Sequence, residues 1–347
     1  MSVACFTSIS FSYLARARVL AHTLKRHHPD WAFSVCITDR EPEGFTFDIE
    51  KEPFDQVVWA DELPIERVKG WLFKHDLVEA CTAVKGPVLD ELTRTTADKI
   101  FYFDPDIAVL SSLQPLVDLL DRHSILLTPH QVAPDTKDGA IIDNEVGSLR
   151  WGTYNLGFIG IRNNGAGRQM TRWWRYRLER FCYDDIPSGL FVDQKWCNLV
   201  PGLFQDVAVV RDPGCNVASW NISQRRISID LNGKVRAAGY PLRFFHFTKQ
   251  GSVGEIMTQK NAVENIEVYE LWSWYERMLE RYSELAIPAG WWHYGCFQNG
   301  ERIPRSARML YRSRTDLQDA FPDPFACGEG TFEAWLRQHA DPTAARQ

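Results

Sequence analysis

The sequence has no C-x-x-C pair, although eight of its 347 residues are cysteines. Wide spacing in a chain of this length favours reduced thiols over a disulfide framework or a structural zinc site, and reduced thiols are typical of cytoplasmic proteins. There is also no run of about 18 apolar residues and no signal-peptide pattern at the N-terminus, so the sequence predicts no transmembrane segment. We therefore expect a cytoplasmic protein, with peripheral contact to the inner face of a membrane left open.

An excess of positive charge is absent as well. Lys and Arg total 39 against 45 Asp and Glu, which gives a net charge of −6. Domains that bind nucleic acid are usually basic, so this balance argues against nucleic acid as a partner. Tryptophan is abundant, with 13 copies. Most are expected in the core, and four are candidates for stacking on a sugar: Trp196, Trp220, Trp291 and Trp292.

Apolar strand patterns alternate with helical patterns through the first half of the chain. The expected strands are Val3–Ser8, Trp31–Thr38, Gln56–Ala60, Lys99–Phe103, Ile125–Pro129 and Tyr154–Ile161. The expected helices are Tyr13–Lys25, Leu72–Lys85 and Gly167–Phe181. This alternation predicts an α/β fold with a mostly parallel sheet covered by helices, in which ligands bind beyond the carboxyl ends of the strands.

The pattern changes near residue 250, where we place a domain boundary. Shorter strands are expected before it, at Val207–Val210, Ile227–Asp230 and Leu242–Phe247. After it, helical patterns such as Val268–Leu285 dominate and then give way to loop-rich sequence. We therefore expect a first domain of residues 1–250 that carries the site, and a helical, loop-rich extension of residues 251–347.

Two carboxylates end a strongly apolar strand, in the segment Asp104-Pro105-Asp106. On a bend, carboxylates separated by one residue can both point at one hard divalent cation, and Mg²⁺ and Mn²⁺ prefer oxygen ligands. Asp-Pro-Asp is also ordinary turn chemistry, so a solvated turn is the alternative. The motif alone does not decide between the two.

A second polar pair follows an aromatic strand much later in the chain. His246 could supply an imidazole to a metal, and Lys249 an ammonium group to a phosphate. A buried histidine of the core is the alternative. His130, which follows another expected strand, could line the same site or lie in an ordinary loop.

Two further segments combine polar side chains with apolar surroundings. Asp193 and Gln194 stand at the start of an expected helix around Gln194–Leu199, where a capping Asp with a surface Gln is the alternative. Asn155 lies inside an apolar strand and must find partners there. Gly157 allows close backbone approach or, alternatively, marks a bulge.

Together these four segments resemble the GT-A fold nucleotide-diphosphosugar glycosyltransferases, with the closest pattern in glycosyltransferase family 8 and related bacterial polysaccharide enzymes. The resemblance covers about residues 1–251 and keeps the family's order of a D-x-D strand, an N-x-G strand, an acidic-Gln pair and a late His. The late motif reads H-F-T-K-Q-G here, without the Pro-Trp usual in the family. The resemblance implies a GT-A (Rossmann-like) catalytic domain of residues 1–250, with the extension as an acceptor or packing region.

The resemblance also implies a role for each residue. It implies a Mn²⁺ or Mg²⁺ ion held by Asp104, Asp106 and His246, and catalytic roles for Gln194 and Asp193. A nucleotide-diphosphate sugar, with UDP-hexose favoured, is expected to contact Thr7, Ser8, Lys85, Asp104, Asn155, Gly157 and Lys249.

Several alternatives accompany this interpretation. Lys85 could be a solvated lysine at a helix end, and Thr7 and Ser8 could belong to a plain strand-to-helix turn. The implied reaction is hexosyl transfer to a glycan, a lipid-linked sugar or a protein, with retention of anomeric configuration. A non-catalytic nucleotide- or carbohydrate-binding protein is a second class. A phosphatase with an aspartate nucleophile is a third, although Ile107-Ala108-Val109 lacks the Gly and Thr or Val that usually follow its D-x-D.

Overall fold

The computed structural model describes residues 2–249, 251, 253–262 and 264–339. Its main sheet runs in the order β10 (Val207–Val209), β6 (Ile125–Pro129), β7 (Tyr154–Arg162), β4 (Lys99–Phe103), β1 (Val3–Ile9), β2 (Ala32–Ile37) and β3 (Gln56–Trp59). Within this described sheet, β7 is antiparallel to both neighbours and the other pairs are parallel. The expected α/β fold with a mostly parallel, mixed sheet is therefore confirmed.

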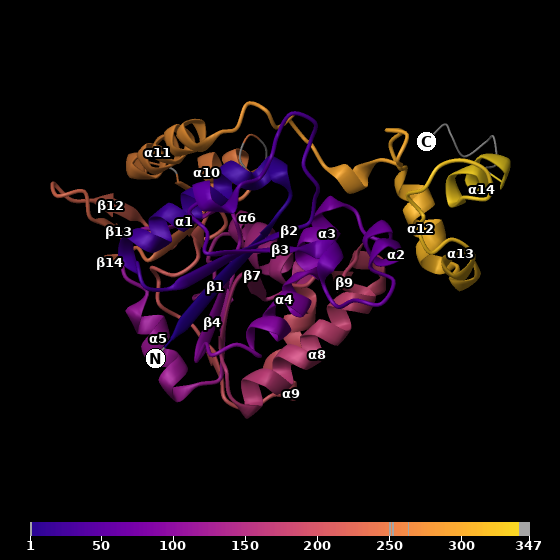
Figure 1. The fold of residues 1–347 in the computed structure, drawn as a ribbon. Coiled ribbons are helices and arrows are strands. Elements are labelled where there is room, and N and C mark those ends of the chain that lie inside the picture. Colours follow the sequence, from indigo (N-terminus) through magenta and orange to yellow (C-terminus); the bar gives the residue numbers. More distant parts are fainter. Residues whose placement is uncertain (1, 250, 252, 263, 340–347) are drawn as a thin grey trace.

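Helices cover both faces of the main sheet, and alternation along β1 explains why (Figure 1). Val3 and Cys5 enter the hydrophobic cluster under α1 (Leu14–His27) and α5 (Gln114–Arg122), whereas Ala4 and Phe6 enter the opposite cluster. Side chains of a strand point alternately to its two faces, so an unbroken apolar strand needs helices on both sides. The opposite face is covered by α2 (Val68–Phe73), α3 (Leu77–Ala83), α4 (Lys85–Leu92) and α8 (Gly165–Phe181).

A small sheet extends the strand that carries the two carboxylates. It has the order β11 (Val217–Ala218), β15 (Phe244–His246) and β5 (Ile107–Val109). β5 begins directly after Asp106 and runs antiparallel to β15, with Ile107 opposite His246. This pairing brings the late histidine beside the D-x-D bend.

The remaining elements are short and lie mostly around this core. The strands are β8 (Asp184–Asp185), β9 (Leu190–Phe191), β12 (Ile227–Ile229), β13 (Val235–Ala237) and β14 (Tyr240–Pro241). The helices are α6 (Asp138–Ala140), a π-helical stretch Ile141–Val146, α7 (Gly147–Trp151) and α9 (Val200–Leu203). Short 3₁₀ helices are Phe11–Tyr13, Ile49–Lys51, Ala60–Glu62, Ile186–Ser188, Lys195–Leu199 and His293–Gly295.

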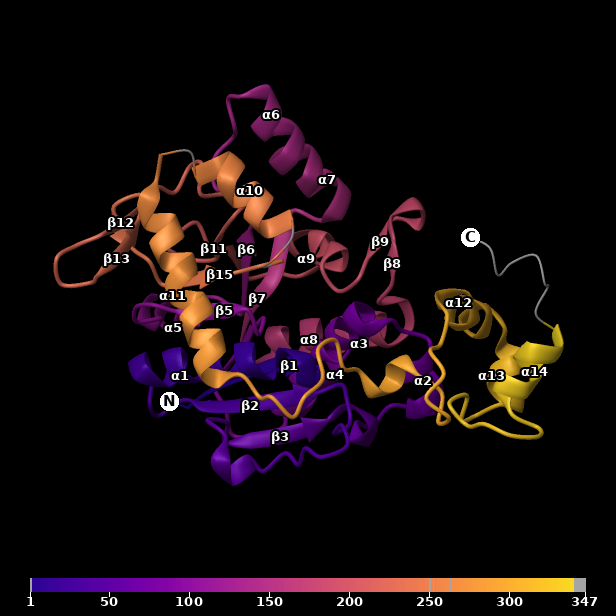
Figure 2. The same ribbon diagram turned by 90° about the horizontal axis from the view of Figure 1, so that it is seen from above.

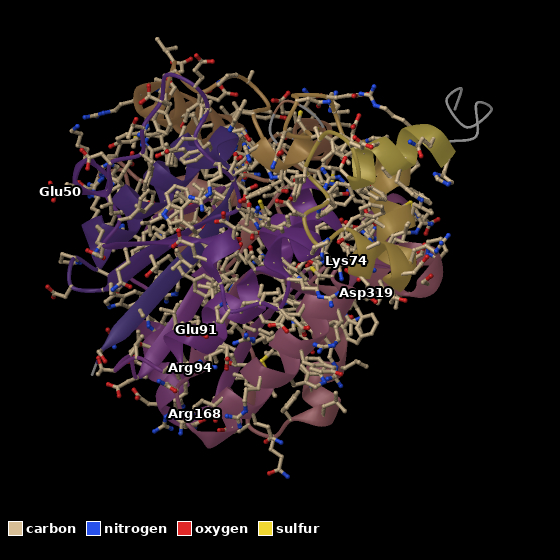
Figure 3. The ribbon with its side chains drawn as sticks, turned by 45° about the vertical axis from the view of Figure 1, so that its right-hand side comes forward. Glu50, Lys74, Glu91, Arg94, Arg168 and Asp319 are labelled. Carbon is tan, nitrogen blue, oxygen red and sulfur yellow. The ribbon has the colours of Figure 1, made fainter. Side chains whose placement is uncertain are left out.

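The C-terminal part packs on the rest of the chain in two places (Figure 2). α10 (Val253–Ala262) and α11 (Ile266–Tyr282) share a hydrophobic cluster with Val19 and Val217. α12 (Arg305–Ser313), α13 (Thr315–Ala320) and α14 (Phe332–His339) pack on the cluster that also contains α2. An ion pair of Arg67 with Asp319 and a hydrogen bond from Lys74 to Gln318 join α13 to the α2 region, where Figure 3 labels Asp319 and Lys74. The division at residue 250 stays a prediction.

Two expected elements differ from the structure. The expected helix Leu72–Lys85 is instead split, because Asp76 caps a new helix with a reciprocal bond to Glu79. The expected helix Gln194–Leu199 is a 3₁₀ turn over Lys195–Leu199. Within the described residues, no helix has both the length and the apolar character needed to span a bilayer.

Candidate functional site

Asp104 and Asp106 lie on a bend whose backbone is tied on both sides. The amide of Asp104 donates to Gly157 O at 2.8 Å, and the amide of Phe247 donates to Asp106 O at 2.8 Å. The first bond joins the bend to β7 and the second joins it to β15. The two carboxylates are therefore held by the sheets around them rather than by a free turn.

Asp104, Asp106 and His246 form the candidate metal site. His246 Nε2 lies 3.0 Å from Asp106 Oδ1 and 3.7 Å from Asp104 Oδ2. One ligand atom from each residue falls within 4.8 Å of the others. Two carboxylates and one imidazole are a donor set suited to Mn²⁺ or Mg²⁺. The partly buried carboxylates do not fit the solvated-turn alternative, whereas His246, at 3% exposed and with polar partners, also fits the description of a buried histidine of the core.

Charge pairing governs the protonation of this set. Burial works to lower the pKa of His246, but the charges of Asp106 and Asp104 raise it above its ordinary value. For Asp106, burial raises the pKa, and the ion pair with His246 outweighs it and lowers the pKa overall. The metal-free site therefore favours an imidazolium at His246 beside the ionised carboxylate of Asp106.

Lys85 is buried at the centre of the site, contrary to the alternative of a solvated helix-end lysine. It is the first residue of α4 and is 2% exposed. Its Nζ lies 3.1 Å from Asp104 Oδ1, 2.9 Å from Asp193 Oδ2 and 4.2 Å from the centre of the Tyr102 ring. Burial would lower the pKa of Lys85, but Asp104 and Asp193 raise it well above its usual value. The lysine is therefore a fixed positive charge behind the metal ligands.

Asp193 and Gln194 are buried and held in place rather than exposed at a helix start. Burial raises the pKa of Asp193 to about 6 against the pull of Lys85. Gln194 Oε1 accepts from the backbone amide of Leu156 at 3.2 Å, and its Nε2 donates to Trp151 O at 3.0 Å. The pair thus lies beside Lys85 and β7, as the expected grouping requires.

Asn155 and Gly157 lie on β7 against His246. Asn155 Oδ1 accepts from the Gly157 amide at 3.1 Å and from Asn216 Nδ2 at 2.9 Å, so the polar side chain finds its partners. A Cβ at Gly157 would lie 2.5 Å from His246 Cε1. Glycine at this position leaves the space that the imidazole occupies.

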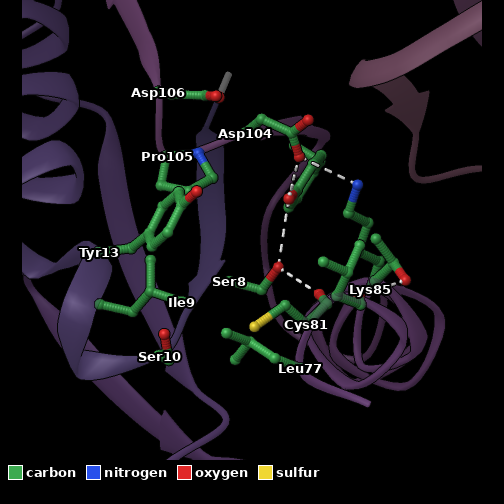
Figure 4. Close-up of a pocket in the computed structure, with 13 residues that line it drawn as sticks. Ser8, Ile9, Ser10, Tyr13, Leu77, Cys81, Lys85, Asp104, Pro105 and Asp106 are labelled. Atoms are coloured by element: carbon green, nitrogen blue, oxygen red, sulfur yellow. Dashed lines mark hydrogen bonds and ion pairs between the residues drawn. The ribbon is translucent and has the colours of Figure 1, made fainter. Parts of the chain in front are cut away.

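A largely apolar cavity opens beside the two carboxylates (Figure 4). In the figure, Tyr13 lies on one side of it and Lys85 on the other. Its remaining lining residues are Ser8, Ile9, Ser10, Leu77, Val78, Cys81, Thr82, Tyr102, Asp104, Pro105 and Asp106. The cavity therefore joins an apolar wall to the metal ligands.

Ser8 and Thr7 have different positions relative to this cavity. Ser8 lines it, donates to Cys81 O at 2.6 Å and lies 3.2 Å from Tyr102 Oη. Thr7 is fully buried and is not among the lining residues. Neighbouring side chains of a strand point to opposite faces, so the two cannot both face the cavity. The buried position of Thr7 therefore does not favour its predicted contact with the nucleotide.

The other sequence candidates, Lys249 and the four tryptophans, are not among the residues that line the cavity. Lys249 is exposed, has φ of +51° and does not line the cavity. The indole N–H groups of three tryptophans donate to backbone carbonyls: Trp196 to Phe181, Trp291 to Arg40 and Trp292 to Thr38. The Trp220 ring lies 5.4 Å from both the His246 and His130 rings. Of the four tryptophans, Trp220 is the one that contacts the metal-ligand set.

Three residues of the site were not predicted from the sequence. Tyr102 donates to Asp104 Oδ1 at 2.5 Å, and Asn216 Oδ1 lies 3.3 Å from His246 Nδ1. Tyr13 is 38% exposed and lines the cavity. Alternation along β4 could have found Tyr102, because it lies two residues before Asp104 on the same face. Asn216 carried no local signal, since only the pairing of β11 with β15 brings it near.

Comparisons with known proteins give relatives of two kinds. No protein-family model matches the sequence. The uncharacterized protein YfnF of Bacillus subtilis strain 168 is 29% identical over 178 residues, which is 51% of this chain and 55% of YfnF. The uncharacterized protein YfnD of the same strain is 23% identical over 248 residues, or 70% of this chain and 76% of YfnD. The aligned part of this chain therefore spans about half the length of YfnF.

Several solved structures are similar to this chain. The galactosyltransferase LgtC, in complex with donor and acceptor sugar analogues, is 16% identical with a TM-score of 0.44, covering 83% of this chain and 98% of LgtC. The glycosyltransferase GlyE of Streptococcus pneumoniae is 16% identical with a TM-score of 0.45, covering 80% and 64%. The bifunctional glycosyltransferase WbbM is 13% identical with a TM-score of 0.42, covering 78% and 51%. These identities and TM-scores are too low to transfer an activity to this chain.

Proposed function

We propose that this protein is a metal-dependent glycosyltransferase that moves a hexose from a nucleotide-diphosphate donor, with UDP favoured. The observation that carries the proposal is the convergence of Asp104, Asp106 and His246 at the edge of an apolar cavity, with the buried cation Lys85 behind them. Such a site offers both a surface for a nucleoside and fixed charge for a diphosphate.

The donor is expected to fill the cavity from its apolar end. Tyr13, Ile9 and Leu77 present ring and aliphatic surface to a nucleobase, and hydroxyls such as Ser8 lie at its wall. A nucleoside seated there has its diphosphate beside Asp104 and Asp106. This placement supports the expectation that Asp104, Asp106 and His246 would hold Mn²⁺ or Mg²⁺, which would supply positive charge to the diphosphate.

Charge stabilisation is the main chemical task of this site. A bound cation supplies a Lewis acid that neutralises the diphosphate as it leaves. The chain contributes Lys85, whose charge is held by Asp104 and Asp193 and needs no rearrangement during the reaction. His246 Nε2 and Asp106 Oδ1 lie 3.0 Å apart, so one cation could contact both.

Retention of configuration at the transferred sugar is part of the proposal. Gln194 is clamped between Leu156 N and Trp151 O, and Asp193 is fixed by Lys85. We expect both to hold the sugar or to stabilise positive charge on it, while the acceptor hydroxyl attacks from the face that the diphosphate leaves and passes its proton to the departing phosphate oxygen. NMR of the product anomer tests this step, and an inverted linkage contradicts it.

The acceptor is proposed as a glycan, a lipid-linked sugar or a protein. Cytoplasmic localisation, with or without contact to the inner membrane face, stays a prediction. Incubation with UDP-hexoses, Mn²⁺ and a panel of glycan acceptors tests the activity, with free UDP and elongated acceptor as readouts. Binding of UDP and Mn²⁺ without release of UDP from any donor would favour the non-catalytic binding protein instead.

A further inference from the structure

Asn216 lies behind the metal-ligand set and contacts His246. It is 1% exposed and directly precedes β11, whose Ala218 pairs with His246 of β15. Its backbone has φ of +53°, a conformation that Asn adopts more readily than other non-glycine residues. Its Oδ1 lies 3.3 Å from His246 Nδ1.

The orientation of the Asn216 amide is fixed by its other contacts. The Gly157 amide donates to Asn155 Oδ1 at 3.1 Å, so that oxygen is an acceptor. Asn216 Nδ2 donates to it at 2.9 Å and to Thr128 Oγ1 at 2.9 Å. Both N–H bonds of Asn216 are thereby used. The atom that faces His246 is the carbonyl oxygen, which can only accept.

An acceptor beside Nδ1 decides which nitrogen of His246 is left for a metal. In the metal-free chain Nε2 faces Asp106 and Nδ1 faces Asn216, so each N–H of an imidazolium has an acceptor. A cation that binds Nε2 takes the place of that proton, and the Nδ1 proton stays on the ring because Asn216 accepts it. The ring occupies the space that a Cβ at Gly157 would enter, and Trp220 crosses it edge to face at 5.4 Å.

We propose that Asn216 is a positioning residue for the metal, because its amide oxygen holds His246 with the Nε2 lone pair toward Asp104 and Asp106. This inference rests on the metal site of the proposed function. Partners that fix metal-bound histidines typically change metal affinity by about 10–100-fold.

Two variants separate the acceptor oxygen from the rest of the side chain. Asn216→Gly keeps the positive φ and loses every side-chain contact, whereas Asn216→Asp keeps an oxygen beside Nδ1 and loses the donor bonds to Asn155 and Thr128. Calorimetric titration with Mn²⁺ is expected to give about 10–100-fold weaker binding for Asn216→Gly and wild-type or tighter binding for Asn216→Asp. A merely structural role predicts that both variants bind Mn²⁺ about equally weakly, since both lose the same donor bonds.

Matched measurements keep the outcome clear. Thr171→Val removes an equally buried hydroxyl, which donates to Gly167 O within α8 and does not contact Asn216 or His246, so its Mn²⁺ affinity is expected to match wild type. Asn216→Asp as weak as Asn216→Gly, with both variants folded by circular dichroism, overturns the inference. Wild type that binds no Mn²⁺ overturns the metal site and this inference together. Wild type that binds Mn²⁺ but releases no UDP from any donor overturns the proposed activity alone and leaves the role of Asn216 to the variants.

Discussion

Lys85 lies between two carboxylates that differ in exposure. Its Nζ pairs with Asp104, whose side chain is 26% exposed, and with Asp193, whose side chain is 3% exposed. Without the lysine, Asp104 can turn to water or a cation, whereas Asp193 has no access to water. The buried half of this network therefore depends on Lys85 for its charge.

Lys85→Met is expected to lower the free energy of unfolding by about 3–5 kcal/mol near pH 8, because an unpaired charge is left buried. The pKa of Asp193 is raised to about 6 in the folded chain, above its unfolded value. The protonated form of Asp193 therefore contributes stability to the folded chain at low pH, and this contribution is lost as the pH rises through about 6. The drop in unfolding free energy caused by Lys85→Met is therefore expected to be smaller near pH 5, where Asp193 protonates. Denaturant unfolding of wild type and variant at the two pH values measures this drop.

Lys99→Met is the matched control for that prediction. Lys99 is equally buried, but its partner Asp121 has a side chain that is 49% exposed. Water can solvate Asp121 after the substitution, so no comparable pH dependence is expected. An equal loss for Lys85→Met at both pH values would contradict the account of Asp193.

Asp106→Asn is expected to remove nearly all sugar transfer at any Mn²⁺ concentration. The amide has no charge to offer a cation, and it withdraws the ionic partner of His246. Turnover of a UDP-hexose across a Mn²⁺ titration measures it. Asp118→Asn, on the exposed face of α5, is the control and is expected to keep wild-type turnover. Near-normal turnover of Asp106→Asn would mean that the bend holds no metal.

The sequence predicted site residues whose role lies in their chemical type. Asp104, Asp106 and His246 were chosen because carboxylates and imidazole bind metals, and the structure brings them together. Tyr102 and Asn216 were missed because a phenol or an amide can hydrogen-bond to many groups, from water to backbone. Their role in the site depends on the residues that the fold places beside them.

At the scale of elements, β7 approaches β15 closely because Gly157 has no side chain. Gly157→Ala would place a Cβ 2.5 Å from His246 Cε1 and 2.8 Å from Asn155 Oδ1. Either the imidazole or β7 must shift, and such overpacking typically costs about 1–3 kcal/mol. We expect that loss in thermal unfolding, together with weaker Mn²⁺ binding.

Gly165→Ala is the comparison for this prediction. Gly165 begins α8, the helix that follows β7, and a Cβ there meets nothing within 4 Å. We expect stability and Mn²⁺ affinity close to wild type. Unchanged Mn²⁺ binding by Gly157→Ala would show that His246 does not need the space above residue 157.

Elements with strong local patterns were predicted well, and elements made by pairing were not. β4 and β6 have the expected bounds because their apolar runs end abruptly at polar or proline residues. β5 was missed because three residues carry no readable alternation. It exists because β15 pairs with it from a distant part of the chain.

At the scale of the whole molecule, residues 291–293 of the C-terminal part are hydrogen-bonded to the residues that follow β2. Asp39 accepts backbone N–H groups from Phe11, Arg40 and His293, at 2.9, 2.9 and 2.6 Å. One buried carboxylate thus joins the first helical turn, at Phe11, to His293 in the C-terminal part. Trp291 and Trp292 add their bonds to the same edge.

Asp39→Ala is expected to loosen this connection without reaching the metal ligands. Three backbone N–H groups lose their acceptor, at a typical cost of about 1–3 kcal/mol for each one left buried. We expect a lower unfolding temperature and faster protease cleavage between residues 283 and 303. Mn²⁺ affinity is expected to be retained.

Asp48→Ala serves as the control, because Asp48 caps only a short surface helix. We expect it to change neither cleavage nor unfolding temperature appreciably. Wild-type protease resistance of Asp39→Ala would contradict the view that this carboxylate fastens the extension.

The fold class follows from the sequence because strand and helix periods alternate along it. The packing of the described residues after 250 does not follow from the sequence. It depends on contacts such as those of Arg308 with the carbonyls of Phe73, His75 and Tyr294. These bonds lie in a buried junction between distant segments. Neither segment has a sequence pattern that indicates which other segment it contacts.

The most direct test of the proposed function is the melting temperature with UDP, with and without Mn²⁺, for wild type and Asp106→Asn. A ligand that binds the folded state raises the melting temperature. We expect UDP to raise it strongly only when Mn²⁺ is present, and only in wild type. No rise for wild type with UDP, GDP, dTDP or CMP in Mn²⁺, or an equal rise in Asp106→Asn, would contradict the metal-dependent donor site.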